Sequence, residues 1–117
     1  FMAQDLTLER VVPWIPWLLI YVLSNGAMEE LLFRGLFLQK LEPFFGKLLS
    51  NILVAFVFTS LHSFANYTSE MTIFIAVVTL LAILWGYIMQ KTNSALASIL
   101  FHAGMDISIM LGMFSNL

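Results

Sequence analysis

The chain has 117 residues, which is the size of a single domain. It is 61% hydrophobic and 10% charged, whereas soluble domains average about 45–50% and about 25%. Three runs contain no Asp, Glu, Lys or Arg, namely residues 11–28, 48–69 and 71–90. A soluble helix bundle needs a charged face on each helix, so these runs exclude that class. The absence of cysteine excludes disulfides and thiolate nucleophiles, and the five dispersed basic residues give no sign of a nucleic-acid partner.

The predicted elements are four apolar helices. The three charge-free runs are 18, 22 and 20 residues long, close to the roughly 20 residues that cross a bilayer. Proline is tolerated in a first helical turn, so Pro13 and Pro16 are compatible with the start of the first helix. A break at Glu42-Pro43 and Gly46 separates the first helix from the second. The expected helices cover residues 13–41, 47–62, 71–90 and 94–114.

The predicted fold class is therefore an all-α, polytopic membrane protein with a bundle of about four transmembrane helices. We expect residues 1–117 to form one domain, and the absence of an N-terminal signal sequence suggests a fragment of a larger helical bundle. The lipid bilayer is then an obligatory partner.

Basic residues indicate the orientation of these helices. Lys40, Lys47 and Lys91 flank the first and third connectors, whereas the other side carries only Arg10. The positive-inside rule therefore places the first and third connectors in the cytoplasm. The expected location is therefore a membrane that several helices cross.

Six ionisable residues lie inside the predicted spans, and each costs several kcal/mol there unless it is paired or faces water. From the rise of 1.5 Å per residue, Glu29 and His102 lie about 16 Å from the lysine-bearing side and His62 about 22 Å. Three helices thus place polar groups at similar depth, where they can converge on one site. The six residues are Glu29, Glu30, Arg34, His62, His102 and Asp106.

Spacing within the helices divides the roles of these residues. Glu30 and Arg34 are i,i+4 with the acid first, the favourable orientation for an ion pair. Glu29 projects roughly 100° away from Glu30, so the two carboxylates serve different purposes. Glu29 is left desolvated and suits a general base. His102 and Asp106 are also i,i+4 and share one helix face.

Three motifs in this order resemble the CAAX-protease and bacteriocin-processing (CPBP, or Abi) family of membrane proteases. Residues 29–34 fit its E-E-x-x-x-R motif, residues 58–62 its F-x-x-x-H motif, and residues 102–106 its H-x-x-x-[N/D] motif. The segment from Gly86-Tyr87 through Asn93-Ser94 also resembles the approach to the third motif. The resemblance covers about residues 20–112.

The resemblance implies an intramembrane endopeptidase, similar to type II CAAX prenyl endopeptidases or to members linked to bacteriocin maturation and self-immunity. With this resemblance, the expected location is a bacterial cytoplasmic membrane. Its substrate would be a peptide or protein, with a prenylated one as a candidate. Glu29 and His62 would activate water, Glu30 and Arg34 would support them, and His102 and Asp106 would stabilise an oxyanion or ligate a metal. The third motif commonly ends in Asn, and an ionised Asp106 cannot donate a hydrogen bond to an oxyanion.

Two questions stay open at this level. Glu29, His62, His102 and Asp106 are residue types that bind a divalent metal such as Zn²⁺, but neither histidine lies in an H-E-x-x-H motif, so a metal-free glutamate mechanism is equally compatible. There are two alternative functions. One is a non-catalytic membrane binding or immunity protein of the same fold. The other is an ion-coupled transport segment, since intramembrane acids and histidines also mark ion pathways.

Overall fold

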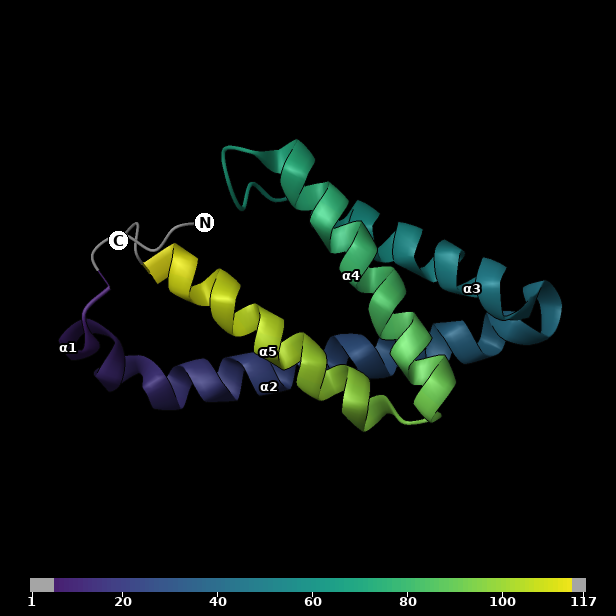
Figure 1. Ribbon diagram of the computed structural model, residues 1–117, viewed down its shortest axis with the longest axis horizontal. Helices are drawn as coiled ribbons and strands as arrows, with labels where there is room; N and C mark the ends of the chain where they lie inside the picture. The colour runs from purple at the N-terminus through teal and green to yellow at the C-terminus, as the bar shows by residue number, and fades with distance from the viewer. Residues whose placement is uncertain (1–5, 115–117) are drawn as a thin grey trace.

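The computed structural model describes residues 6–114, with side chains to residue 112, and within this range the protein is all-α without strands. This confirms the predicted fold class. A short helix and a 3₁₀ turn precede four long α-helices, and a π-helical stretch lies between the first and second of these. Figure 1 shows their arrangement. In chain order they are α1 (Leu8–Val11), η1 (Val12–Trp14), α2 (Ile15–Glu30), η2 (Leu31–Leu38), α3 (Gln39–His62), α4 (Met71–Thr92) and α5 (Ala95–Phe114).

Helix α3 folds back on itself at Gly46. A straight helix over the 55 residues of Leu8–His62 would be about 80 Å long, but the longest dimension of the molecule is 50 Å. Gly46 has φ 75° and ψ 172°, a conformation that glycine adopts without steric cost. At this point the chain reverses direction (Figure 1).

The predicted break at Glu42-Pro43 and Gly46 contains the reversal at Gly46, but the predicted helix end at residue 41 comes a few residues too early. Pro43 lies inside the helical stretch and does not end it. A proline removes only one backbone hydrogen bond, whereas the reversal needs a positive φ, and Gly46 supplies it. The predicted starts of the following arm at residue 47 and of α4 at residue 71 agree with the structure.

Three helices are long and apolar enough to cross a membrane, namely Leu8–His62, Met71–Thr92 and Ala95–Gly112. Because the first of them folds back at Gly46, its two arms, α4 and α5 correspond to the four helices expected from the sequence.

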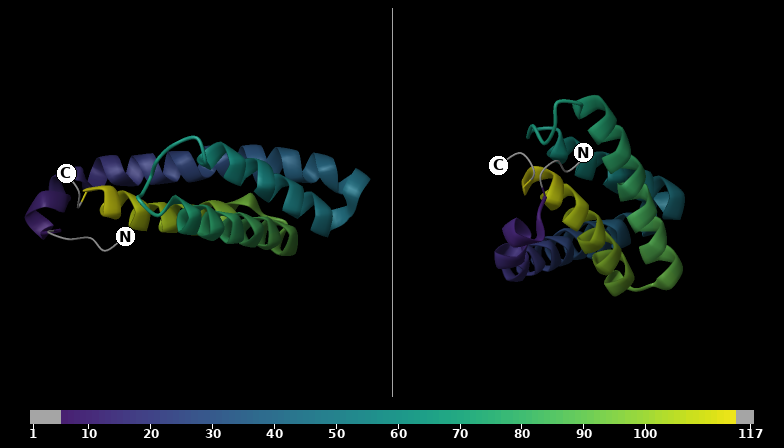
Figure 2. Two further views of the ribbon diagram at one scale, coloured as in Figure 1. Left: turned by 90° about the horizontal axis from the view of Figure 1, so that it is seen from above. Right: turned by 60° about the vertical axis from the view of Figure 1, so that its left-hand side comes forward.

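The helices form two layers, with α2 and α3 in one and α4 and α5 in the other (Figure 2). Helix α5 packs on α2, and α4 packs on α3. Gly26 allows the first contact to be close, since a Cβ there would lie 3.2 Å from the carbonyl oxygen of Ile99. Asn93, with φ 51°, ends α4 in a left-handed cap and starts the turn into α5.

The first and third connectors lie at the same end of the molecule, as expected. The Gln90 side-chain amide near the end of α4 donates to Glu42 Oε1 (3.0 Å) and to the Lys47 carbonyl oxygen (2.8 Å). The lysine-bearing connectors are thus neighbours.

Gly86 brings α4 against α3. The side chain of Asn51 lies where a Cβ of residue 86 would be, and its amide donates to the Ile83 carbonyl oxygen (2.9 Å). Asn51 is buried, so this hydrogen bond satisfies a group that would otherwise be costly.

We predict that Gly86→Ala destabilises the fold by about 1–3 kcal/mol, because the new methyl group must displace Asn51. Unfolding of the detergent-solubilised protein, followed by circular dichroism, measures the change. Gly104→Ala is the matched control, since nothing lies within 4 Å of a Cβ at that exposed position. Equal stability of the two variants would contradict the packing described.

Candidate active site

The end of α2 and the π-helical stretch η2 position the first motif. Glu30 and Arg34 are completely buried, and Arg34 Nη1 donates to Glu30 Oε1 at 3.0 Å. The predicted ion pair is therefore confirmed. Wider π-helical turns are rare and occur frequently at functional sites, and here the turn begins directly after Glu30.

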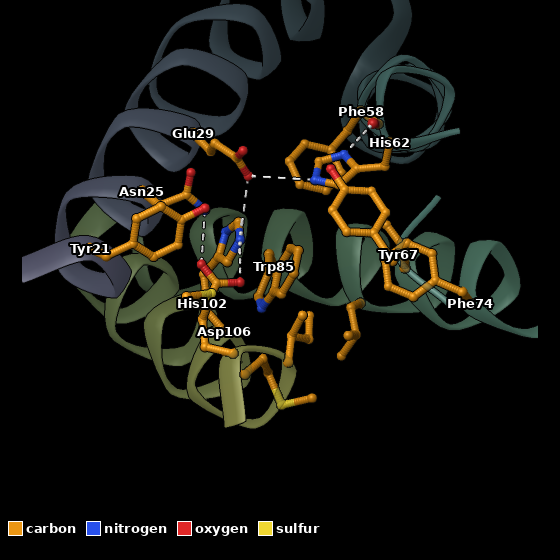
Figure 3. A pocket seen from close by; sticks show the side chains of 15 residues that line it. Tyr21, Asn25, Glu29, Phe58, His62, Tyr67, Phe74, Trp85, His102 and Asp106 are labelled. Atoms are coloured by element: carbon orange, nitrogen blue, oxygen red, sulfur yellow. Dashed lines mark hydrogen bonds and ion pairs between the residues drawn. The ribbon is translucent and has the colours of Figure 1, made fainter. Parts of the chain in front are cut away.

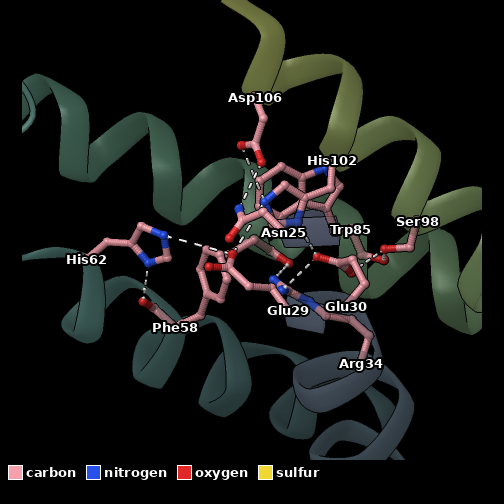
Figure 4. Close-up of polar contacts among 11 residues, drawn as sticks. Asn25, Glu29, Glu30, Arg34, Phe58, His62, Trp85, Ser98, His102 and Asp106 are labelled. Carbon is pink, nitrogen blue, oxygen red and sulfur yellow. Dashed lines mark hydrogen bonds and ion pairs between the residues drawn. The ribbon is translucent and has the colours of Figure 1, made fainter. Parts of the chain in front are cut away.

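The Glu30–Arg34 pair binds the other layer of helices (Figure 4). Arg34 Nη2 donates to the Ala82 carbonyl oxygen on α4 at 2.9 Å. On α5, the Ser98 hydroxyl donates to Glu30 Oε2, and His102 Nδ1 lies 2.7 Å from Glu30 Oε1. A buried ion pair persists only when further hydrogen bonds satisfy both ions, and this one has such bonds from two helices.

His102 is oriented by this network. Glu30 accepts hydrogen bonds from Arg34 and Ser98 and is the acidic partner of the Arg34 ion pair, so the Nδ1 of His102 is the donor in its contact with Glu30. The imidazole also stacks on the indole of Trp85, with centroids 4.0 Å apart and planes 6° from parallel. Its Nε2 consequently faces away from Glu30, toward Glu29.

The Glu29 side chain points away from Glu30 and toward two histidines, as its position around the helix predicts. Its Oε2 lies 3.4 Å from His102 Nε2 and 4.0 Å from His62 Nε2. The three residues come from α2, α3 and α5, which the sequence separates widely. The structure thus brings together the three groups that the depth estimate placed at similar levels.

His62 at the end of α3 is held by its own helix and by two rings. Its Nδ1 lies 2.9 Å from the Phe58 carbonyl oxygen, which only accepts, so Nδ1 is the donor and Nε2 is directed at Glu29. The His62 ring packs on Phe58, with centroids 4.3 Å apart, and stacks with Tyr67 of the α3–α4 connector at 6.1 Å.

Asp106 lies one turn beyond His102 and faces an amide that the sequence analysis missed. Its Oδ1 is 3.6 Å from His102 Nε2, and its Oδ2 accepts a hydrogen bond of 2.9 Å from Asn25 Nδ2 on α2. Asp106 therefore acts here as an acceptor.

A cavity of about 360 Å³ joins these groups (Figure 3). Glu29, His62, His102 and Asp106 contribute to its polar part together with Asn25, and aromatic and aliphatic side chains line the rest. A neighbouring apolar groove of about 420 Å³ along α4 and α5 shares part of this lining. The shared residues are Phe74, Val78, Leu81, Met105 and Ile109.

Several residues that build the site were not predicted, although two of them carried a signal. Asn25 precedes Glu29 by four residues and Ser98 precedes His102 by four, so each shares a helix face with a predicted site residue. Trp85 and Tyr67 had no such signal, because apolar helices are rich in aromatic residues and only the tertiary contacts select these two.

The donor arrangement does not form a metal site. Within the described part of the chain, no three His, Asp or Glu side chains form a group that could hold a metal ion, including the candidates Glu29, His62, His102 and Asp106. The described side chains at this site therefore do not fit zinc or another metal ion.

We predict that Arg34→Met destabilises the protein by about 3–5 kcal/mol, because Glu30 is left as a buried charge without its cation. Detergent unfolding curves provide the measurement, and Lys40→Met, which removes an exposed charge at the neighbouring connector, is the control. A loss no larger than that of the control would show that the pair does not hold the fold.

Comparison with known protein families supports the resemblance seen in the motifs. Residues 11–108 match the family described as Type II CAAX prenyl endopeptidase Rce1-like, a span that includes all six predicted site residues. No curated protein and no solved structure matches the chain. The family and the long apolar helices together indicate an integral membrane protease acting on peptide substrates. The chain belongs to the Rce1-like type II CAAX prenyl endopeptidase family.

Proposed function

We propose that this protein is a CAAX-type intramembrane endopeptidase that hydrolyses a peptide bond with water activated by Glu29 and His62. The observation that carries the proposal is the position of the Glu29 carboxylate, 3.4 Å and 4.0 Å from the Nε2 atoms of His102 and His62, at the wall of a cavity. A carboxylate and two imidazoles within reach of one small molecule form a general acid–base site.

Glu29 and His62 are arranged to hold the attacking water. In the neutral tautomer that its Phe58 contact selects, His62 presents a lone pair on Nε2, and Glu29 presents a carboxylate oxygen. A water between them donates one hydrogen to each acceptor. Its oxygen lone pair then points into the cavity, where a peptide carbonyl carbon can lie.

Hydrolysis then follows in two steps. The water oxygen bonds to the carbonyl carbon while Glu29 takes one of its protons, and the carbonyl oxygen becomes an oxyanion. The carbon–nitrogen bond breaks as Glu29 returns that proton to the leaving nitrogen. The products are a carboxylic acid and an amine, and Glu29 is regenerated.

His102 is the proposed partner of the oxyanion. Its Nε2 faces the carboxylate oxygens of Glu29 and Asp106. Because Nδ1 already donates to Glu30, a donor role for Nε2 makes His102 an imidazolium in this proposal. Glu30 fixes the ring through Nδ1, and Trp85 fixes its plane. A donor held in place before the reaction stabilises developing charge without reorganisation.

The substrate class we propose is a peptide that carries a prenyl group on cysteine. The apolar groove beside the cavity is lined by Phe74, Val78 and Leu81, and such a surface accommodates a hydrocarbon chain. The family match favours this class over a bacteriocin leader, an immunity role or ion transport. A bacterial cytoplasmic membrane stays the predicted location, with the lysine-bearing connectors on the cytoplasmic side.

We predict that Glu29→Gln lowers kcat at least about 10³-fold, because glutamine cannot take a proton from water. Cleavage of a farnesylated CAAX peptide in detergent or nanodiscs, followed by mass spectrometry, measures the loss. Glu9→Gln, which neutralises an exposed acid on α1, is the control and should keep full activity. Cleavage by Glu29→Gln within tenfold of the unmodified protein would remove the mechanism.

Asp106→Asn should keep cleavage within about tenfold, whereas Asp106→Leu should lose most of it. Asparagine retains an acceptor for the Asn25 amide and adds a donor toward the oxyanion, while leucine leaves that amide unpaired. The same peptide assay distinguishes the two variants. If Asp106→Asn were as inactive as Asp106→Leu, the negative charge itself would be required and the acceptor role would be insufficient.

A further inference from the structure

The indole nitrogen of Trp85 is a buried donor without a partner. Trp85 is 3% exposed, and its Nε1 forms no hydrogen bond in the described part of the chain. An indole N–H can only donate, and a buried donor left unpaired costs about 1–3 kcal/mol. Buried tryptophans usually find an acceptor, so this one requires an explanation.

The ring is not free to turn toward another acceptor. One face stacks on His102, and its edge contacts Phe58 with centroids 5.8 Å apart. The guanidinium carbon of Arg34 lies 5.4 Å from the ring centroid. The site network therefore fixes the direction of the N–H.

A second buried atom without a hydrogen bond belongs to the same cavity, although the Nε2 atoms of His102 and His62 lie 3.4 Å and 4.0 Å from it. Besides Trp85 Nε1, the buried Glu29 Oε2 has no hydrogen-bond partner, and both residues line the cavity (Figure 3). Other buried polar atoms without a partner lie on residues that do not line it, namely Arg34, Ser50 and Thr59. Among the buried polar atoms of the described residues, this donor and this acceptor are therefore the two that lack a hydrogen bond and belong to residues lining the cavity.

These two groups have the hydrogen-bonding sense that a peptide and its attacking water would satisfy. A carbonyl oxygen accepts from the Trp85 N–H, and water donates to Glu29. A purely hydrocarbon ligand would form no hydrogen bond with either group, so the free-energy penalty of two unsatisfied buried polar atoms would remain. The polar end of the cavity therefore fits a peptide backbone, whereas the adjoining groove is apolar.

We propose that Trp85 is a substrate-binding residue whose indole N–H donates a hydrogen bond to a backbone carbonyl oxygen of the bound peptide. This inference rests on the proposed proteolytic function and adds a recognition contact that the three sequence motifs do not contain. Trp85 also stacks on the His102 ring. A phenylalanine at this position would keep an aromatic ring against His102 while removing the N–H.

Nuclear magnetic resonance of the indole N–H groups tests the contact directly. The protein carrying Glu29→Gln, labelled with ¹⁵N-tryptophan in nanodiscs, is titrated with an uncleaved farnesylated CAAX peptide. The Trp85 signal, assigned by its absence in Trp85→Phe, should move downfield as the peptide binds. The signal of the exposed Trp17 serves as the internal control and should not move. An unmoved Trp85 signal at saturating peptide would overturn the proposal.

Binding measurements supply an independent readout. In the Glu29→Gln background, Trp85→Phe should weaken the peptide Kd about tenfold, the worth of one buried hydrogen bond of roughly 1.4 kcal/mol. Trp17→Phe should leave the Kd unchanged. An unchanged Kd in Trp85→Phe, with normal cleavage by the unmodified protein, would overturn the role of Trp85 and leave the proteolytic function intact. Absence of cleavage by the unmodified protein would instead remove the proposed function, while the titration would still report on Trp85.

Discussion

The buried ion pair between Glu30 and Arg34 is the interaction on which the rest of the structure depends. Two charges without solvent exposure are costly in an apolar bundle, so the chain must surround them with hydrogen bonds. The Ala82 carbonyl oxygen, the Ser98 hydroxyl and His102 supply these bonds from α4 and α5. Satisfying one ion pair therefore connects the two layers of helices and, through His102, fixes a ring that faces the cavity.

The two consecutive glutamates, Glu29 and Glu30, serve different purposes. Glu30 turns inward to the ion pair, and Glu29, displaced around the helix, turns into the cavity beside the Nε2 atoms of His62 and His102. One side of the helix end thus stabilises the fold, and the adjacent side provides a group without a hydrogen-bond partner. A bundle in which every polar group were paired would hold a substrate less well, because binding would have to break existing bonds.

Much of this arrangement could be predicted from local geometry. The i,i+4 spacing fixed the partner of Arg34, and the constant rise of a helix placed Glu29, His62 and His102 at similar depth. Helix geometry says nothing about how helices pack, so the acceptor role of Asp106 toward Asn25 and the stacking of Trp85 on His102 could not be derived. The predicted break included Gly46, where the chain reverses, but the first helix was ended too early, because a proline is a conspicuous signal and Pro43 stays inside the helix.

A double-mutant cycle tests the central claim, that Glu29 and His62 act on one water molecule. The kcat/KM for a farnesylated CAAX peptide is measured for Glu29→Gln, His62→Ala and the combined variant. If both residues hold the same water, the second substitution adds almost nothing, and the combined loss equals that of Glu29→Gln alone within about threefold. Losses that multiply would mean that the two residues work independently, which would contradict the shared site described here.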